Sequence, residues 1–175
     1  YSEALLGVVV TALPAIVIVI GIDPGITGAL SVHENSDLKE VTDMPVMPQG
    51  KKNKKQVNAA QLSHIIKTIQ EGNENYCAVV EQVQPMPMEG VTSSFNFGQT
   101  FGIIKGVLGA LKIPVYFVQP RKWKKHFNLI GAEKDASRTK AIELYPSYSN
   151  FLSRKKDINR AEAILIGRFF IDGEV

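Results

Sequence analysis

The stretch AIVIVIGIDPGITGAL, residues 15–30, runs from an unbroken apolar segment into a turn rich in glycine and proline, and one carboxylate, Asp23, stands where the segment ends. β-Branched residues bounded by a turn signal are typical of a strand buried on both faces at the centre of a sheet. An isolated charge is costly to bury. The stretch therefore predicts the central strand of the fold, and Asp23 is the first candidate for a functional residue.

The rest of the chain predicts a mixed α/β order. Short β-rich segments bounded by turn residues predict five strands, at 16–22, 28–34, 39–46, 77–83 and 114–120. Apolar residues at helical spacing predict four helices, at about 58–72, 94–111, 134–146 and 159–170. Asn58 is the expected N-cap of the first helix and Gly72 its stop. With 175 residues, of which 45% are hydrophobic, the chain is long enough for one domain with a continuous core.

The N-terminal segment is interpreted separately. Residues 4–22 carry no charge and match the length of a membrane span, about 20 residues. The β-branched second half of that segment favours a buried strand over a lipid-facing helix. Residues 1–15 begin without a Met and are set off by Pro14, so they are interpreted as an extension, a processed leader or a cloning remnant.

Positive charge is gathered in three clusters. The formal net charge is only +3, but the chain contains KKNKK at 51–55, RKWKK at 121–125 and RKK at 154–156. One such run is often a solvated loop, whereas three favour a polyanionic partner such as a nucleic acid. The single Cys77 forms no internal disulfide, which predicts an intracellular, reducing compartment. Bacterial or phage-infected cytoplasm is favoured over an organelle.

Three acids stand on segments that are expected to be buried. Asp23 ends the first strand, Glu81 interrupts the strand at 77–83, and Glu162 is flanked by alanines in the last helix. One acid at a strand end is commonly a loop cap or an ion-pair partner, but three together favour a cation between them. Carboxylates without nearby His or Cys suit Mg²⁺ or Mn²⁺ better than zinc. Two such ions per site can activate a water and stabilise a leaving oxygen during attack on a phosphodiester.

The motifs of the chain resemble those of a known family. IGIDPGITGAL, VVEQVQPMPMEGVTSSFNFGQTFG, PVYFVQPRKWKKHFNLIGAEKDASRTKAIELYP and KKDINRAEAILIGRFF occur in this order and resemble the RuvC-like Holliday junction resolvases, in their phage and plastid branch. The resemblance implies a ribonuclease H-like nuclease domain over 16–175, with a five-stranded mixed sheet and helices on both faces. It also implies a homodimer and Mg²⁺-dependent paired nicking of four-way DNA junctions in recombination, repair or DNA processing.

The resemblance also implies roles for individual residues. Asp23 and Glu81 match the first two metal ligands of the family, and Glu162 matches the acid on its last helix. Lys124 and Lys134 match basic residues that family members use near the scissile phosphate.

One position departs from the family pattern. Family members commonly carry Asp or His about one helical turn before the last acid, and this chain has Asn159 there. Asn159 lies on the same helix face as Glu162 but adds no negative charge. Asp157 is slightly favoured as the residue that completes the metal site in its place. If neither serves, the second metal is expected to bind weakly and turnover to be slow.

The DNA contacts that we expect come from the basic clusters and from the start of the second helix. They are Lys51, Lys52, Lys54, Lys55, Ser93, Ser94, Phe95, Arg121, Lys122, Lys125, Lys134, Arg154 and Lys155. Helix capping is the alternative role for the two serines.

Other residues have two readings. Phe97 and Phe101 are more often core residues than base-stacking ones. The stripe Gly98, Gly102 and Gly106 seats either a dimer partner or the chain's own sheet. Trp123 is expected to anchor its loop to the core, and His126 to be a surface or phosphate contact.

Three other functions stay open. GIDPGITG also resembles the first phosphate loop of the actin and sugar-kinase ATPases, but this chain has no residues for the second lobe those enzymes need. A ribonuclease acting on RNA or an RNA–DNA hybrid would have the same fold. The third alternative is a junction-binding protein whose cleavage is weakened by the Asn159 substitution.

Overall fold

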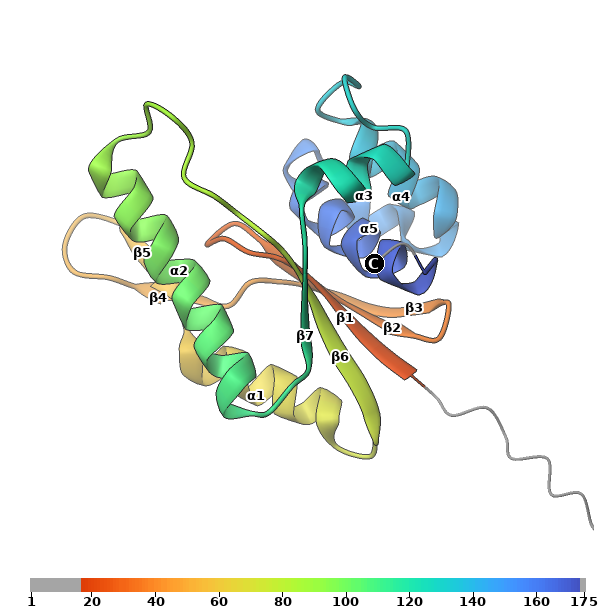
Figure 1. Ribbon diagram of the computed structural model, residues 1–175, viewed down its shortest axis with the longest axis horizontal. Coiled ribbons are helices and arrows are strands. Elements are labelled where there is room, and N and C mark those ends of the chain that lie inside the picture. Colours follow the sequence, from red (N-terminus) through yellow and green to blue (C-terminus); the bar gives the residue numbers. More distant parts are fainter. Residues whose placement is uncertain (1–16, 174–175) are drawn as a thin grey trace, which may run out of the picture.

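The computed structural model describes residues 17–173 and builds them around one five-stranded sheet, so the expected extension at 1–15 lies outside the described residues. The strand order is β3-β2-β1-β6-β7 (Figure 1). The strands are β1 (Val17–Asp23), β2 (Ala29–Glu34), β3 (Asp37–Asp43), β6 (Asn75–Glu81) and β7 (Val115–Val118). The hairpins β1-β2 and β2-β3 are antiparallel, while β6 is parallel to both β1 and β7. This confirms the predicted mixed sheet with β1 at its centre.

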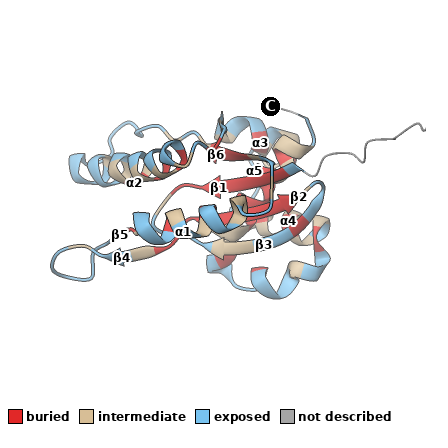
Figure 2. Ribbon diagram, turned by 90° about the horizontal axis from the view of Figure 1, so that it is seen from below, coloured by how far each residue is buried: buried red, intermediate tan, exposed pale blue. Residues whose placement is uncertain are grey.

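Helices cover both faces of the sheet (Figures 1 and 2). One face packs against α1 (Ala59–Gln70) and α2 (Val91–Ala110), the other against α3 (Pro120–His126), α4 (Ala136–Leu144) and α5 (Ile158–Ile171). The alternation of β1 explains both cores, because Ile18, Ile20 and Ile22 point into the first and Val19 into the second. A central strand that is apolar on both faces therefore serves two separate cores.

The contact between β1 and α5 is unusually close and depends on glycine. A Cβ atom at Gly21 would collide with the carbonyl oxygen of Ala163 and lie 2.7 Å from the amide nitrogen of Gly167. Ser31 on β2 donates a hydrogen bond of 2.8 Å from its Oγ to the same Ala163 carbonyl. The position of α5 on the sheet is thus set at Ala163, the neighbour of Glu162.

The start of α1 is confirmed, but the bounds of other predicted helices and strands differ in the structure. The side chain of Asn58 does cap α1, since its Oδ1 accepts a hydrogen bond from the Gln61 amide at 3.1 Å. The helix α2 begins at Val91 rather than near 94. The strand predicted at 114–120 ends at Val118, because Pro120 occupies the first turn of α3, which the sequence did not predict.

The basic segment around 51–55 is the tip of a small hairpin rather than a plain loop. Its strands are β4 (Val46–Pro48) and β5 (Lys55–Val57), which pair antiparallel. The hairpin lies beside α2 (Figure 1). Two short 3₁₀ helices, η1 (Pro146–Leu152) and η2 (Lys155–Asp157), lead from α4 into α5.

The glycine stripe of α2 faces outward. The core side of this helix is formed by Thr100, Ile104 and Leu108. Apart from their chain neighbours and the adjacent backbone of α2 itself, Cβ atoms built at Gly98, Gly102 and Gly106 meet no described atom within 4 Å. The alternative in which the stripe packs on the chain's own sheet is therefore wrong.

Over residues 17–173, no helix is both long enough and apolar enough to cross a membrane.

Candidate active site

The first two candidate acids end neighbouring parallel strands. Ile22 of β1 pairs with Val80 of β6, so Asp23 and Glu81 are the next residues along the two strands. Both side chains leave the sheet at the carboxyl ends of its parallel strands. Asp23 is buried, with 8% of its surface exposed, and Glu81 is half-buried. The turn after Asp23 needs glycine at Gly28, because a Cβ there would collide with the Asp23 carbonyl.

The third acid, Glu162, lies on α5. Burial raises the pKa of Glu162, and the charge of Glu81 raises it further. Burial also raises the pKa of Asp23 well above its usual range, with the charges of Glu162 and then Glu81 adding to the effect. Burial likewise raises the pKa of Glu81. Since Glu81 and Glu162 both act on Asp23, and Glu81 acts on Glu162, the sheet and α5 bring the three predicted acids within electrostatic range of one another.

Cations and a buried indole surround these acids. Lys124 on α3 lowers the pKa of all three carboxyls against the effect of burial. The neighbouring Trp123 is fully buried and donates a hydrogen bond of 2.7 Å from its Nε1 to Oε2 of Glu81. Trp123 therefore anchors its segment to the core, as expected, and in addition holds the Glu81 carboxylate in place.

The donor chemistry of this cluster suits a hard divalent cation. Oxygen ligands with raised pKa values favour a state in which positive charge compensates them, as Mg²⁺ or Mn²⁺ does. The side chains as they stand do not form a closed cage, since no group of three or more His, Cys, Asp or Glu among residues 17–173 has a metal-holding arrangement. The residues fit such an ion by charge and ligand type.

Asp157 is engaged elsewhere. It is buried to 2% exposure at the start of α5, and its carboxylate accepts hydrogen bonds from the Arg154 amide at 2.9 Å and from Arg154 Nη2 at 2.8 Å. Nη1 of Arg160 lies 3.8 Å from Oδ1 of the same carboxylate. Burial alone would raise the pKa of Asp157, but the hydrogen bonds from Arg154 lower it below its usual value. Its role as a metal ligand stays a prediction that competes with two arginine contacts.

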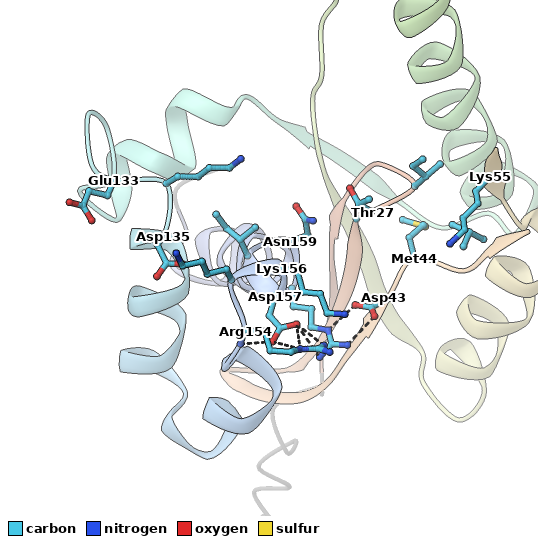
Figure 3. Close-up of a pocket in the computed structure, with 17 residues that line it drawn as sticks. Thr27, Asp43, Met44, Lys55, Glu133, Asp135, Arg154, Lys156, Asp157 and Asn159 are labelled. Atoms are coloured by element: carbon cyan, nitrogen blue, oxygen red, sulfur yellow. Dashed lines mark hydrogen bonds and ion pairs between the residues drawn. The ribbon is translucent and has the colours of Figure 1, made fainter. Parts of the chain in front are cut away.

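Asn159 lines an open cleft beside the acids. The cleft has a volume of about 1120 Å³ and includes Thr27 and Gly28 from the turn after Asp23. The three acids are not part of its wall. Figure 3 shows Asn159 in the middle of this cleft, with Asp43 and the ion pair of Arg154 and Asp157 to one side. The cations in its wall are Lys55, Lys134, Arg154, Lys155, Lys156 and Arg160.

The expected DNA contacts thus fall into groups. The cleft collects Lys55, Lys134, Arg154 and Lys155, whereas Lys51, Lys52 and Lys54 stay at the exposed end of the hairpin. On α3 the exposed cations are Arg121, Lys122 and Lys125. At the start of α2, Ser93 and Phe95 are exposed.

Four other residues are placed as follows. Ser94 donates a hydrogen bond of 3.3 Å to Glu89, outside the capping role considered for it. Phe101 is half-buried and packs against the core, as expected, while Phe97 lines a smaller hollow. His126 bonds to Asp172 at 2.7 Å and packs against aromatic rings, so it has a structural partner.

Sequence reasoning missed two cations. Lys156 belongs to the basic cluster RKK at 154–156 but was not among the expected DNA contacts, and only the structure places it in the cleft. Arg160 pairs with Asp43 through two nitrogens, at 2.7 and 2.9 Å, and donates to the Phe151 carbonyl at 3.0 Å. Nothing in the sequence indicates a partner 117 residues away, so Arg160 had no detectable signal.

Comparison with known proteins now defines the fold. The structure of Thermus thermophilus RuvC matches with a TM-score of 0.52 and 17% identity, over 89% of this chain and 96% of that one. The chain has a RuvC-like fold. T. thermophilus RuvC in complex with a Holliday junction substrate matches with a TM-score of 0.51 and 18% identity, over 87% and 90% of the two chains. The expected ribonuclease H-like class is therefore confirmed. No protein-family model and no curated protein sequence matches the chain.

Proposed function

We propose that the protein is a metal-dependent endonuclease that resolves four-way DNA junctions by paired, symmetric nicks in recombination, repair or DNA processing. The observation that carries the proposal is the meeting of Asp23, Glu81 and Glu162 beside Lys124 on a RuvC-like fold. A structural neighbour in complex with a Holliday junction supports the choice of substrate. The assignment to the phage and plastid branch rests on the sequence motifs alone.

The residues of the site would have different roles in cleavage. Asp23, Glu81 and Glu162 would hold two Mg²⁺ ions, or Mn²⁺, with Asn159 or Asp157 completing the set. When bound, such ions activate a water and stabilise the leaving oxygen of a phosphodiester. Trp123 keeps the Glu81 carboxylate oriented through its hydrogen bond. Lys124 places a positive charge beside the acids, where negative charge on a phosphate develops during cleavage.

The basic cleft would hold the strand that is cut. Phosphate groups are bound mainly by Lys and Arg, and the cleft offers several of them next to the turn that follows Asp23. The exposed cations of the hairpin and α3 extend this surface on either side. Binding is therefore expected to weaken steeply as salt increases.

A homodimer would place two such sites on one junction. Four-way junctions have two-fold symmetry, and paired nicks require two active sites at a fixed separation. The outward glycine stripe of α2 offers a face on which a second backbone could lie closely. We propose that this face seats the partner helix.

One observation favours a second candidate, a junction-binding protein with weakened cleavage. Asn159 brings no charge, and the nearest alternative, Asp157, is held by Arg154. The substitution Asn159→Asp tests this directly. If the native site cleaves weakly because it lacks this charge, the added carboxylate should increase the cleavage rate and the apparent Mg²⁺ affinity. The control Asn150→Asp, on the exposed η1 surface, should change neither.

The deciding experiment compares three labelled substrates of the same sequence: a four-way junction, a linear duplex and an RNA–DNA hybrid, each with Mg²⁺ and with EDTA. Symmetric nicks confined to the junction and dependent on Mg²⁺ are the expected result. Tight binding without nicks would support the second candidate. Preferential cleavage of the hybrid would overturn the proposal in favour of a ribonuclease.

A further inference from the structure

A second hollow lies next to the cleft and has a different lining. It has a volume of about 460 Å³ and is formed by the β4–β5 hairpin, the N-terminal half of α2 and the turn that follows Asp23. This volume is within the range of ligand pockets, roughly 300–1,000 Å³. The wall is rich in side-chain carboxamides: Gln49, Asn53 and Gln56 from the hairpin, and Asn96 and Gln99 from α2.

The side chains of these carboxamides make few hydrogen bonds within the protein itself. Within residues 17–173, their side chains make one hydrogen bond, from Nε2 of Gln49 to Oε1 of Gln99 at a long 3.5 Å. Each carboxamide can donate two hydrogen bonds and accept through its oxygen. The hollow therefore presents several free donors and acceptors side by side, on two elements that face each other.

A nucleobase matches this chemistry. Carboxamides recognise bases by pairing one donor and one acceptor with the edge of the ring, adenine above all. Such edges are accessible when a base is unpaired and unstacked. The ring of Phe97 is half-buried in the same wall, and Ile103 adds apolar surface beside it. Aromatic and apolar side chains of this kind hold the face of an unstacked base.

The position of the hollow relates it to the cutting site. Ile26 and Lys55 line both this hollow and the basic cleft, so the two are neighbours. Gly25 and Ile26, which form one wall, follow the candidate ligand Asp23 by only two and three residues. A strand whose phosphate lies at the acids would thus have a base from a nearby nucleotide within reach of the hollow.

We propose that this amide-lined hollow receives one unpaired nucleobase of the strand being cut, reads its hydrogen-bonding edge and so gives cleavage a base preference. The inference deepens the proposed function and rests on it. Lys54 and Lys55 at the wall suit a nucleic acid, and Glu89 is the one acid there. The bound group is thus a base attached to an anionic backbone.

The test measures cleavage on a set of four-way junctions that differ only in the bases within three nucleotides on either side of the nick. The native protein should cut the best and worst base at one position with rates that differ about tenfold or more, as expected for one well-read base. Gln99→Leu keeps the side-chain size but removes the carboxamide, and should reduce that difference to about twofold to threefold. Gln61→Leu, at an exposed position on α1, is the matched control and should keep the native preference.

A second readout does not need cleavage. A 2-aminopurine base at the preferred position should become more fluorescent when the native protein binds the junction in EDTA, because the base leaves its stack. Asn96→Ala, at an exposed position, combined with Gln99→Leu should reduce that increase without abolishing junction binding.

The outcomes separate the two proposals. A native protein that cuts or binds junctions without base preference and without a fluorescence change overturns only the base-reading hollow. The same preference in Gln99→Leu as in the native protein overturns it as well. A native protein that neither binds nor cuts junctions overturns the proposed function together with this inference.

Discussion

Two turns at the start of α5 carry acids of opposite character. Asp157 is buried and contacts both Arg154 and Arg160, and its pKa is lowered by hydrogen bonds from Arg154 that outweigh burial. Glu162, five residues later, has its pKa raised by burial and by Glu81. The first acid stabilises the fold because its charge is compensated inside the protein. The second is held at a cost in stability, which is consistent with the proposal that this position binds an external cation.

The largest expected effect comes from removing the central acid. Asp23→Asn should lower junction cleavage about a thousandfold, which corresponds to about 4 kcal/mol of transition-state stabilisation, because the proposed metal ligand is lost while the shape is kept. Junction binding should stay close to native, since Lys and Arg hold the phosphates. Without metal, the variant should also melt at a higher temperature than the native protein, because one repelling charge is gone.

The matched control for this variant is Asp37→Asn, at the exposed start of β3, which should change neither cleavage nor melting. Mg²⁺ should raise the melting temperature of the native protein more than that of Asp23→Asn. Equal shifts in both proteins would contradict the metal site, whether or not cleavage is observed.

Acidification should change the free energy of unfolding in opposite directions through the buried histidine and through the buried acids. His33 is buried, and burial followed by the charge of Arg168 lowers its pKa to about 4 from the usual 6.5. The unfolded chain therefore binds a proton that the folded one does not. His33 should cost up to about 3 kcal/mol of unfolding free energy as the pH falls from 6.5 to 4. The carboxyls of Asp23, Glu81 and Glu162, whose pKa values are raised, act in the opposite direction because the folded protein protonates them first.

Urea unfolding at pH 7, 5.5 and 4.5 measures this balance. In His33→Gln the loss of stability over this range should shrink or reverse, although the variant starts less stable at pH 7. The interpretation of His33 as a buried neutral group would be wrong if the native and variant proteins showed the same pH dependence.

The paired acid should matter for stability. Asp157→Ala leaves Arg154 and Arg160 without their shared partner and removes the cap of the 3₁₀ turn before α5. We expect a loss of about 2 to 3 kcal/mol in unfolding free energy. Glu143→Ala, on the exposed side of α4, should change it by less than about 0.5 kcal/mol. The assignment of Asp157 to stability rather than to metal binding would be wrong if Asp157→Ala kept native stability but lost Mg²⁺ binding.

The smallest effect concerns the support of Glu81. Trp123→Phe keeps an aromatic ring but removes the indole N–H that bonds to the carboxylate. Because a partner that orients the proposed metal ligand Glu81 is lost, cleavage should fall about tenfold. The pKa of Glu81 should rise, since that hydrogen bond lowers it. The pH–rate profile should therefore shift toward higher pH. A rate loss without such a shift would indicate a packing defect alone.

Local sequence patterns were sufficient for much of the fold. The β-branched run at 16–22 predicted the central strand, and the cap at Asn58 predicted the start of α1, because both depend on neighbouring residues. The hairpin around 51–55 was missed because its charged tip masks two very short strands. The helix α3 was missed because its basic sequence has no apolar stripe, and its burial depends on one residue, Trp123.

The sequence by itself determined the candidates for the chemistry: three acids on apolar segments, the basic clusters and the order of the motifs. These follow from local composition, since a carboxylate within an apolar run is visible without a structure. Tertiary structure alone decided that Arg160 pairs with Asp43, 117 residues away, that the glycine stripe of α2 faces outward, and that five carboxamides line one hollow. The physical reason is that pairing, exposure and convergence depend on contacts between residues far apart in the chain, and no local pattern records them.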